Sequence, residues 1–141
     1  MYIHWDPALD TREPLIDAEH RLLVLLFRKL DVAIKTHQPE PVLRHIIQVL
    51  VRCVEFHFVS EENLMRETEY PGLAAHAELH GQLLAELGAF VKRLMAHREF
   101  PEDLLYFLNR WLMQHIAIHD QQVAAHVATS ATRPVAEIAY K

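Results

Sequence analysis

Hydrophobic and polar residues recur with helical spacing along four stretches of the chain. In the first stretch, apolar pairs at Leu22/Leu23 and Leu26/Phe27 are followed by Leu30, with charged residues between them. A return every three or four positions is typical of an amphipathic helix, and no stretch shows the strict alternation of a half-buried strand. The pattern predicts four helices, at about residues 16–37, 41–67, 73–97 and 102–127.

Short connections separate the four predicted helices, and each contains proline. Pro39 and Pro41 end the first helix and open the second, Tyr70-Pro71-Gly72 forms a turn, and Pro101 ends the third helix. Helices joined by short connections pack as antiparallel neighbours. The expected fold is therefore all-α, an antiparallel up-down-up-down four-helix bundle.

Both ends of the chain lack the helical period. Residues 1–16 contain two prolines and are predicted to form an N-terminal arm, which Ile3 and Trp5 would pin to the bundle. Residues 128–141 are predicted to be a short C-terminal tail. The whole chain, 1–141, has the length of one domain with a core of its own.

Composition narrows the class of protein. Hydrophobic residues make up 51% and charged residues 23%, as in globular proteins, and only three glycines favour long helices over hairpins. A net charge of −5 without a basic block argues against nucleic acid as a partner. No apolar run approaches the ~18 residues of a membrane span, and no signal peptide is recognised. Cys53, the only cysteine, fits a reducing compartment, so a cytoplasmic location is expected.

Histidine is abundant, with eleven copies, and four candidate ligands form two pairs. His57 with Glu61, and His76 with His80, are four residues apart on consecutive predicted helices. Residues at this spacing share one face of a helix. Two such pairs across one turn predict a metal site between facing helices of the bundle.

The first and fourth predicted helices supply further candidates. His20 lies on the first, and His115, His119 and Asp120 lie on the fourth. Antiparallel connectivity can bring these side chains to one level of the bundle. The helical period would pair His115 with His119 rather than with Asp120, because position i+5 lies well round the helix from i.

These residues, taken in order, resemble the hemerythrins, and most closely the bacterial single-domain members. The resemblance runs from about Trp5 to Val127 and rests on four segments of sequence. They are Ile16-Asp17-x-x-His20, His57-x-x-x-Glu61, Tyr70-Pro71 with His76-x-x-x-His80, and Trp111-Leu112-x-x-His115-Ile116-x-x-x-Asp120. The segment 11–15 before them departs from the family pattern.

The resemblance implies an oxo- or hydroxo-bridged di-iron centre. It assigns His76, His80 and His115 to one iron, His20 and His57 to the other, and Glu61 and Asp120 to bridges between the two. The three-histidine iron is then full at six ligands, whereas the two-histidine iron keeps one position open for dioxygen. The family pattern selects Asp120 over His119, and a local π-bulge would reconcile the five-residue spacing with the helix.

The implied function is non-enzymatic: reversible dioxygen binding for oxygen transport, storage or delivery to an oxygen-consuming enzyme. A site rich in histidine and poor in carboxylates disfavours high-valent oxidising chemistry. The alternatives are an oxygen or redox sensor that signals to a partner, a di-iron enzyme acting on nitric oxide or peroxide, and a structural bundle with fortuitous histidines.

Weaker predictions concern the surroundings of the remaining polar and apolar residues. The dioxygen pocket, by the resemblance, would be lined by Phe56, Trp111, Leu112 and Ile116, which plain core packing explains equally well. Solvent-exposed positions are expected for Glu19 and Glu62, and a solvated face is favoured for Asp17 and Glu78 over support of ligand imidazoles. The histidines that match no ligand position, most of them expected in solvent, are His4, His37, His45, His97 and His126.

Overall fold

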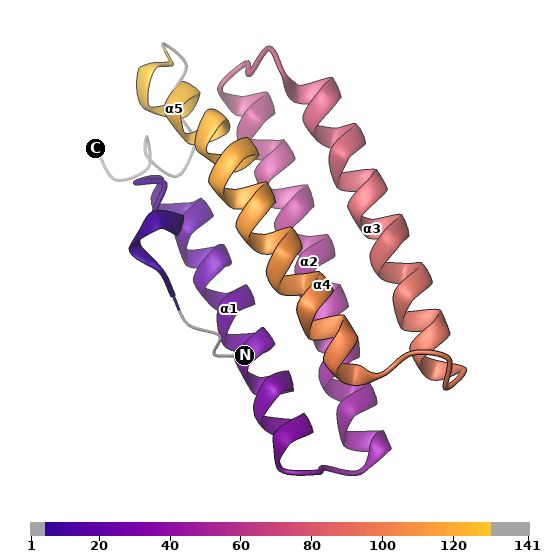
Figure 1. The fold of residues 1–141 in the computed structure, drawn as a ribbon. Coiled ribbons are helices and arrows are strands. Elements are labelled where there is room, and N and C mark those ends of the chain that lie inside the picture. Colours follow the sequence, from indigo (N-terminus) through magenta and orange to yellow (C-terminus); the bar gives the residue numbers. More distant parts are fainter. Residues whose placement is uncertain (1–4, 131–141) are drawn as a thin grey trace.

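Four helical rods run up and down side by side in the computed structural model, which describes residues 5–130 except for the side chains of Leu112 and Met113 (Figure 1). The first three rods are α1 (Pro14–Lys35), α2 (Glu40–Glu67) and α3 (Leu73–Met95). The fourth consists of α4 (Pro101–Gln114), the π-helix η2 (His115–Asp120) and α5 (Gln121–Thr129). Each rod packs against two others, α1 and α3 both contacting α2 and α4. The predicted all-α four-helix bundle is confirmed, without a strand in the described residues.

The first helix begins two residues earlier than the period predicts. Pro14 occupies its first turn, where the missing N–H costs nothing. The side chain of Glu13 accepts a hydrogen bond of 2.7 Å from the N–H of Ile16. This cap satisfies one of the donors that a helix start leaves free.

Three helix ends place a residue other than glycine in the left-handed conformation. His37, Glu69 and His97 have φ values of 55°, 54° and 59°. The next residue donates back to a carbonyl five positions earlier, as from Gln38 to Ala33 at 3.0 Å, which is the Schellman ending of a helix. A chain poor in glycine therefore ends its helices at a conformational cost of ~1–2 kcal/mol per site.

The N-terminal arm is tied to the bundle by Asp17 and Trp5. The Asp17 carboxylate accepts hydrogen bonds from the N–H and hydroxyl of Thr11, at 3.0 and 2.8 Å, and from the N–H of Arg12 at 3.1 Å. The solvated face expected for Asp17 is wrong, because this carboxylate is buried under the loop that it holds. The Trp5 ring lies 4.9 Å from the Arg21 guanidinium carbon; the predicted role of Ile3 falls outside the described residues.

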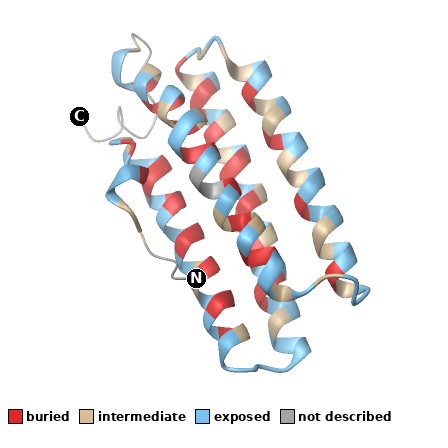
Figure 2. Cartoon of the chain, viewed as in Figure 1, coloured by how far each residue is buried: buried red, intermediate tan, exposed pale blue. Residues whose placement is uncertain are grey.

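Buried residues recur along all four rods, interspersed with exposed ones (Figure 2). They form a large apolar cluster that includes Phe27, Phe58 and Trp111, and a smaller one. The smaller cluster consists of Ile16, Leu64, Met65, Val123 and Val127. In sequence, buried polar residues come between the positions of the large cluster and those of the smaller one, and they form a polar layer of the bundle. In the described residues no helix is both long and apolar enough to cross a membrane.

Candidate metal centre

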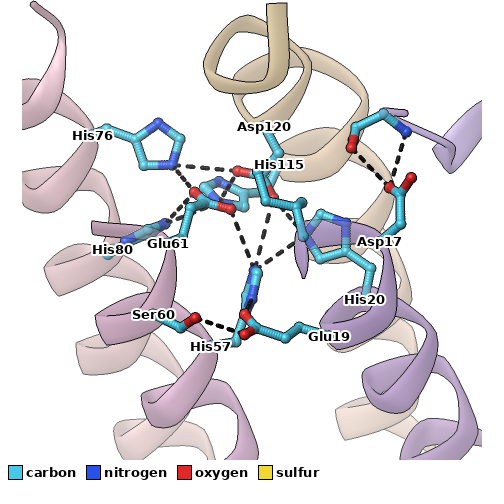
Figure 3. A network of polar contacts seen from close by, with 12 residues as sticks. Asp17, Glu19, His20, His57, Ser60, Glu61, His76, His80, His115 and Asp120 are labelled. Carbon is cyan, nitrogen blue, oxygen red and sulfur yellow. Dashed lines mark hydrogen bonds and ion pairs between the residues drawn. The ribbon is translucent and has the colours of Figure 1, made fainter. Parts of the chain in front are cut away.

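Seven buried polar side chains from all four rods converge on this layer (Figure 3). They are the seven residues that the resemblance assigns as ligands: His20, His57, Glu61, His76, His80, His115 and Asp120. Each is at most 6% exposed. Antiparallel packing therefore brings the predicted candidates to one level of the bundle.

The converging donor atoms fall into two groups that share the two carboxylates. One group contains His76, His80 and His115, and the other contains His20 and His57. Within each group the donor atoms all lie within 4.8 Å of one another. This partition is the one that the resemblance implies for two metal ions.

Each carboxylate directs one oxygen to each group. Asp120 Oδ1 lies 2.9 Å from His115 Nε2, and its Oδ2 lies 2.8 Å from His20 Nε2. Glu61 Oε1 lies 2.6 Å from His76 Nε2, and its Oε2 lies 3.5 Å from His57 Nε2. Both carboxylates therefore reach both groups of imidazoles.

The donor atoms fit metal ions better than they fit one another. Facing Nε2 atoms are 3.1 Å apart in the His20–His57 pair and 3.2 Å apart in the His80–His115 pair. Two nitrogens at right angles, each about 2.1 Å from a metal, would lie about 3.0 Å apart. Imidazole nitrogens approach the oxygens of Glu61 and Asp120 as closely as 2.6 Å, yet none of these four buried oxygens has a well-formed hydrogen bond with another described residue. Such orphaned groups are costly unless a cation binds them, and nitrogen with oxygen donors suit iron.

Two further carboxylates fix the orientation of the imidazoles. Glu19 accepts from His57 Nδ1 at 2.8 Å and from the Ser60 hydroxyl at 2.6 Å, and Glu62 accepts from His80 Nδ1 at 3.0 Å. An ionised carboxylate only accepts, so Nδ1 carries a proton and Nε2 is the nitrogen that faces the centre. The surface positions expected for Glu19 and Glu62 are wrong: the first is buried and the second is 20% exposed.

Sequence reasoning lacked the information to find these two residues. Glu19 precedes His20, and Glu62 follows Glu61, so each lies about 100° round its helix from a predicted ligand. Whether such a side chain meets water or a neighbouring helix depends on how the helices pack. An acidic residue directly beside a predicted ligand was the available signal.

The π-helix resolves the conflict on the fourth rod. A π turn closes i→i+5 hydrogen bonds, and η2 spans the six residues from His115 to Asp120. His115 and Asp120 thereby meet at 2.9 Å, and the predicted π-bulge is confirmed. His119 belongs to neither donor group. It lies beside the centre, partly exposed.

The imidazoles and carboxylates of the centre shift one another's pKa values. Burial disfavours the charged form of His57, but contacts with Asp120 and Glu19 outweigh it and raise its pKa to about 10. Burial likewise opposes protonation of His76, yet Asp120 and Glu61 raise its pKa to about 9. Burial would raise the pKa of Asp120, but the surrounding imidazoles hold it well below its usual value. The nearby carboxylates therefore favour the charged form of the His57 and His76 imidazoles.

The four residues predicted to line a dioxygen pocket have different surroundings. Trp111 and Ile116 are buried in the large apolar cluster, and the Trp111 ring stacks on His115 with centroids 5.9 Å apart. Phe56 is 59% exposed on the outer face of α2, so its predicted place in a pocket or in the core is wrong. The side chain of Leu112 lies outside the described part of the structure.

The remaining histidines lie away from the centre. His37, His45 and His97 are exposed, as expected. His126 is partly buried instead, because its Nε2 lies 2.6 Å from the carbonyl oxygen of Thr68 and ties α5 to the end of α2. His4 falls outside the described residues. Glu78 is exposed on α3, as the favoured interpretation has it.

Comparisons with known proteins place the sequence among its relatives. The sequence model of a family described as Hemerythrin HHE cation binding domain matches residues 13–127. Bacteriohemerythrin from Stenotrophomonas maltophilia is 32% identical over 127 residues, which cover 87% of this chain and 82% of that protein. Bacteriohemerythrin from Pseudomonas aeruginosa is 27% identical, with 84% and 77% covered. A hemerythrin from Sipunculus nudus is 28% identical, with 82% and 86% covered.

Proposed function

The chain belongs to the hemerythrin family, and from this premise we propose that it is a non-heme di-iron protein that binds dioxygen reversibly. The observation that carries the proposal is the division of seven buried donors into two groups bridged by Glu61 and Asp120. Carriage, storage or delivery of oxygen is the role proposed for it.

The two donor groups differ by one imidazole, which gives the two irons different roles. His76, His80 and His115 would hold one iron, and His20 and His57 would hold the other. The iron with fewer histidines keeps a position for a small ligand. When bound, the iron pair supplies that open position and the electrons needed for reversible dioxygen binding.

The protein's own residues favour binding over turnover. Glu19 and Glu62 hold His57 and His80 with their Nε2 atoms toward the centre. Apolar clusters on both sides of the polar layer exclude water. The donor set contains five imidazoles and only two carboxylates, which disfavours high-valent oxidising chemistry. We therefore propose that the protein is not an enzyme.

The test is the visible absorption spectrum of anaerobically reduced, iron-loaded protein before air, after air and after evacuation. Reversible binding predicts a charge-transfer band that appears with air and fades under vacuum. Rapid passage to a stable oxidised form would contradict oxygen carriage and favour a redox sensor. Absence of any iron-dependent band would remove the di-iron assignment.

Substitutions separate the centre from the other histidines. Glu61→Ala removes one of the two bridges and is expected to lose the iron pair. His97→Ala, at an exposed helix end, is expected to keep full iron content. Equal iron content in the two variants, measured after dialysis, would contradict the ligand assignment.

A further inference from the structure

The little exposure that the candidate centre retains is confined to one side. His76 is 6% and His115 is 3% exposed, whereas the other five ligand residues are at most 2% exposed. On the inner side the Phe58 ring stacks on His80, with centroids 3.8 Å apart and planes within 5°. A molecule or ion from solvent therefore meets His76 and His115 first.

A cleft of about 630 Å³ reaches the centre on that same side. It runs between α3, which contributes Leu79, Leu83 and Glu86, and the fourth rod. The fourth rod contributes Tyr106, Phe107, Arg110, Trp111, Gln114, His115 and His119. One ordered water needs only about 10–15 Å³ of such volume, so a hydrated cation fits. His115 is the one ligand residue in the wall of this cleft.

His119 lines the same cleft, beside the buried ligands. Its ring centroid is 5.6 Å from that of His115 and 6.3 Å from that of His76. Its side chain is only partly buried, unlike the seven ligand residues, and it is outside both groups of converging donors. An imidazole at this place can bind a metal ion before that ion meets the centre, but it does not complete the centre.

We propose that this cleft is the route by which divalent metal ions reach the centre, with His119 as a transient ligand on the way. The proposal rests on the metal centre of the proposed function. An arriving cation must exchange water for protein ligands, and a ligand placed before the centre divides that exchange into smaller steps. The Glu86 carboxylate attracts the cation at the cleft, while Arg110 in the same cleft opposes it.

The experiment measures how fast metal-free protein takes up Co²⁺, by stopped-flow absorbance, together with the final affinity in a competitive titration. His119→Ala is expected to slow uptake about tenfold and to leave the affinity within twofold of wild type. His119→Asp, which restores a metal-binding side chain, is expected to recover most of the rate. His45→Ala, an exposed histidine on α2, is the matched control and should load at the wild-type rate.

A second variant tests the cleft without touching His119. Gln114 is exposed and lines the cleft, so Gln114→Trp fills the route while circular dichroism checks the fold. It is expected to slow uptake at unchanged affinity. Wild-type rates in both Gln114→Trp and His119→Ala would overturn the proposal, as would a parallel loss of affinity in His119→Ala, which would make His119 a permanent ligand. Failure of the wild-type protein to bind Co²⁺ would instead contradict the metal centre itself.

Discussion

Replacing Glu19 tests whether a carboxylate outside the ligand set controls the metal centre. Its two oxygens accept from His57 Nδ1 at 2.8 Å and from the Ser60 hydroxyl at 2.6 Å, and the side chain is buried. Glu19→Gln keeps the size and one accepting oxygen, but it removes the charge. Glu19→Ala removes both hydrogen bonds and leaves His57 Nδ1 without its partner.

The expected magnitude follows from these contacts. Loss of a hydrogen-bond partner behind a metal ligand typically costs 10- to 100-fold in metal affinity, or about 1.4–2.8 kcal/mol. A charge-assisted hydrogen bond is about twice as strong as a neutral one. Glu19→Gln should therefore fall near the tenfold end, and Glu19→Ala near the 100-fold end. Glu62→Gln should cost less than Glu19→Gln, because Glu62 is partly exposed and supports only His80.

The assay is a competitive Co²⁺ titration of metal-free protein against a chelator of known affinity. Glu78→Gln, which removes an exposed carboxylate from α3, controls for the change in net charge. An affinity of Glu19→Ala within twofold of wild type would refute the reasoning, as would an equal loss in Glu78→Gln.

Three further results are expected. Phe58→Ala should lower the free energy of unfolding, measured in urea, by about 3–5 kcal/mol, because it leaves a cavity at a core position that is 1% exposed. Phe56→Ala, at an exposed position, should change it by less than about 0.5 kcal/mol. Equal losses in the two variants would contradict the assigned burial. His37→Gly should stabilise by about 0.5–1 kcal/mol, since glycine relieves the left-handed strain at φ 55°, and a lower Tm would oppose this. In the folded protein without metal, the pKa values of His57 and His76 are raised to about 10 and 9. Protonation of these two side chains therefore stabilises the fold fully below about pH 6.5, and this stabilisation is lost as the pH rises through 9–10. The Tm of the metal-free protein should fall over that range. Co²⁺ binding at pH 7 should release protons, which a pH-sensitive dye in weakly buffered solution detects. A pH-independent Tm with no proton release would contradict the raised pKa values.

The sequence by itself determined the four helices and their antiparallel order, through the helical period and the prolines between helices. The four-residue spacing put His57 with Glu61, and His76 with His80, on one face each, and the resemblance to the hemerythrins completed the set of seven residues that meet at one level. The helical period favoured His119 as the partner of His115, the family pattern selected Asp120 instead, and a π-bulge was the hypothesis that reconciled the two.

Only the tertiary structure decided which flank of each helix is covered. Glu19 lies about 100° round α1 from His20, and it is buried because α2 brings His57 and Ser60 to that side. Phe56 is apolar, yet it is exposed because no helix of the described residues packs on its side of α2. A helical period gives each side chain a direction, whereas burial and hydrogen-bond partners depend on the position of neighbouring helices, which residues distant in the sequence determine.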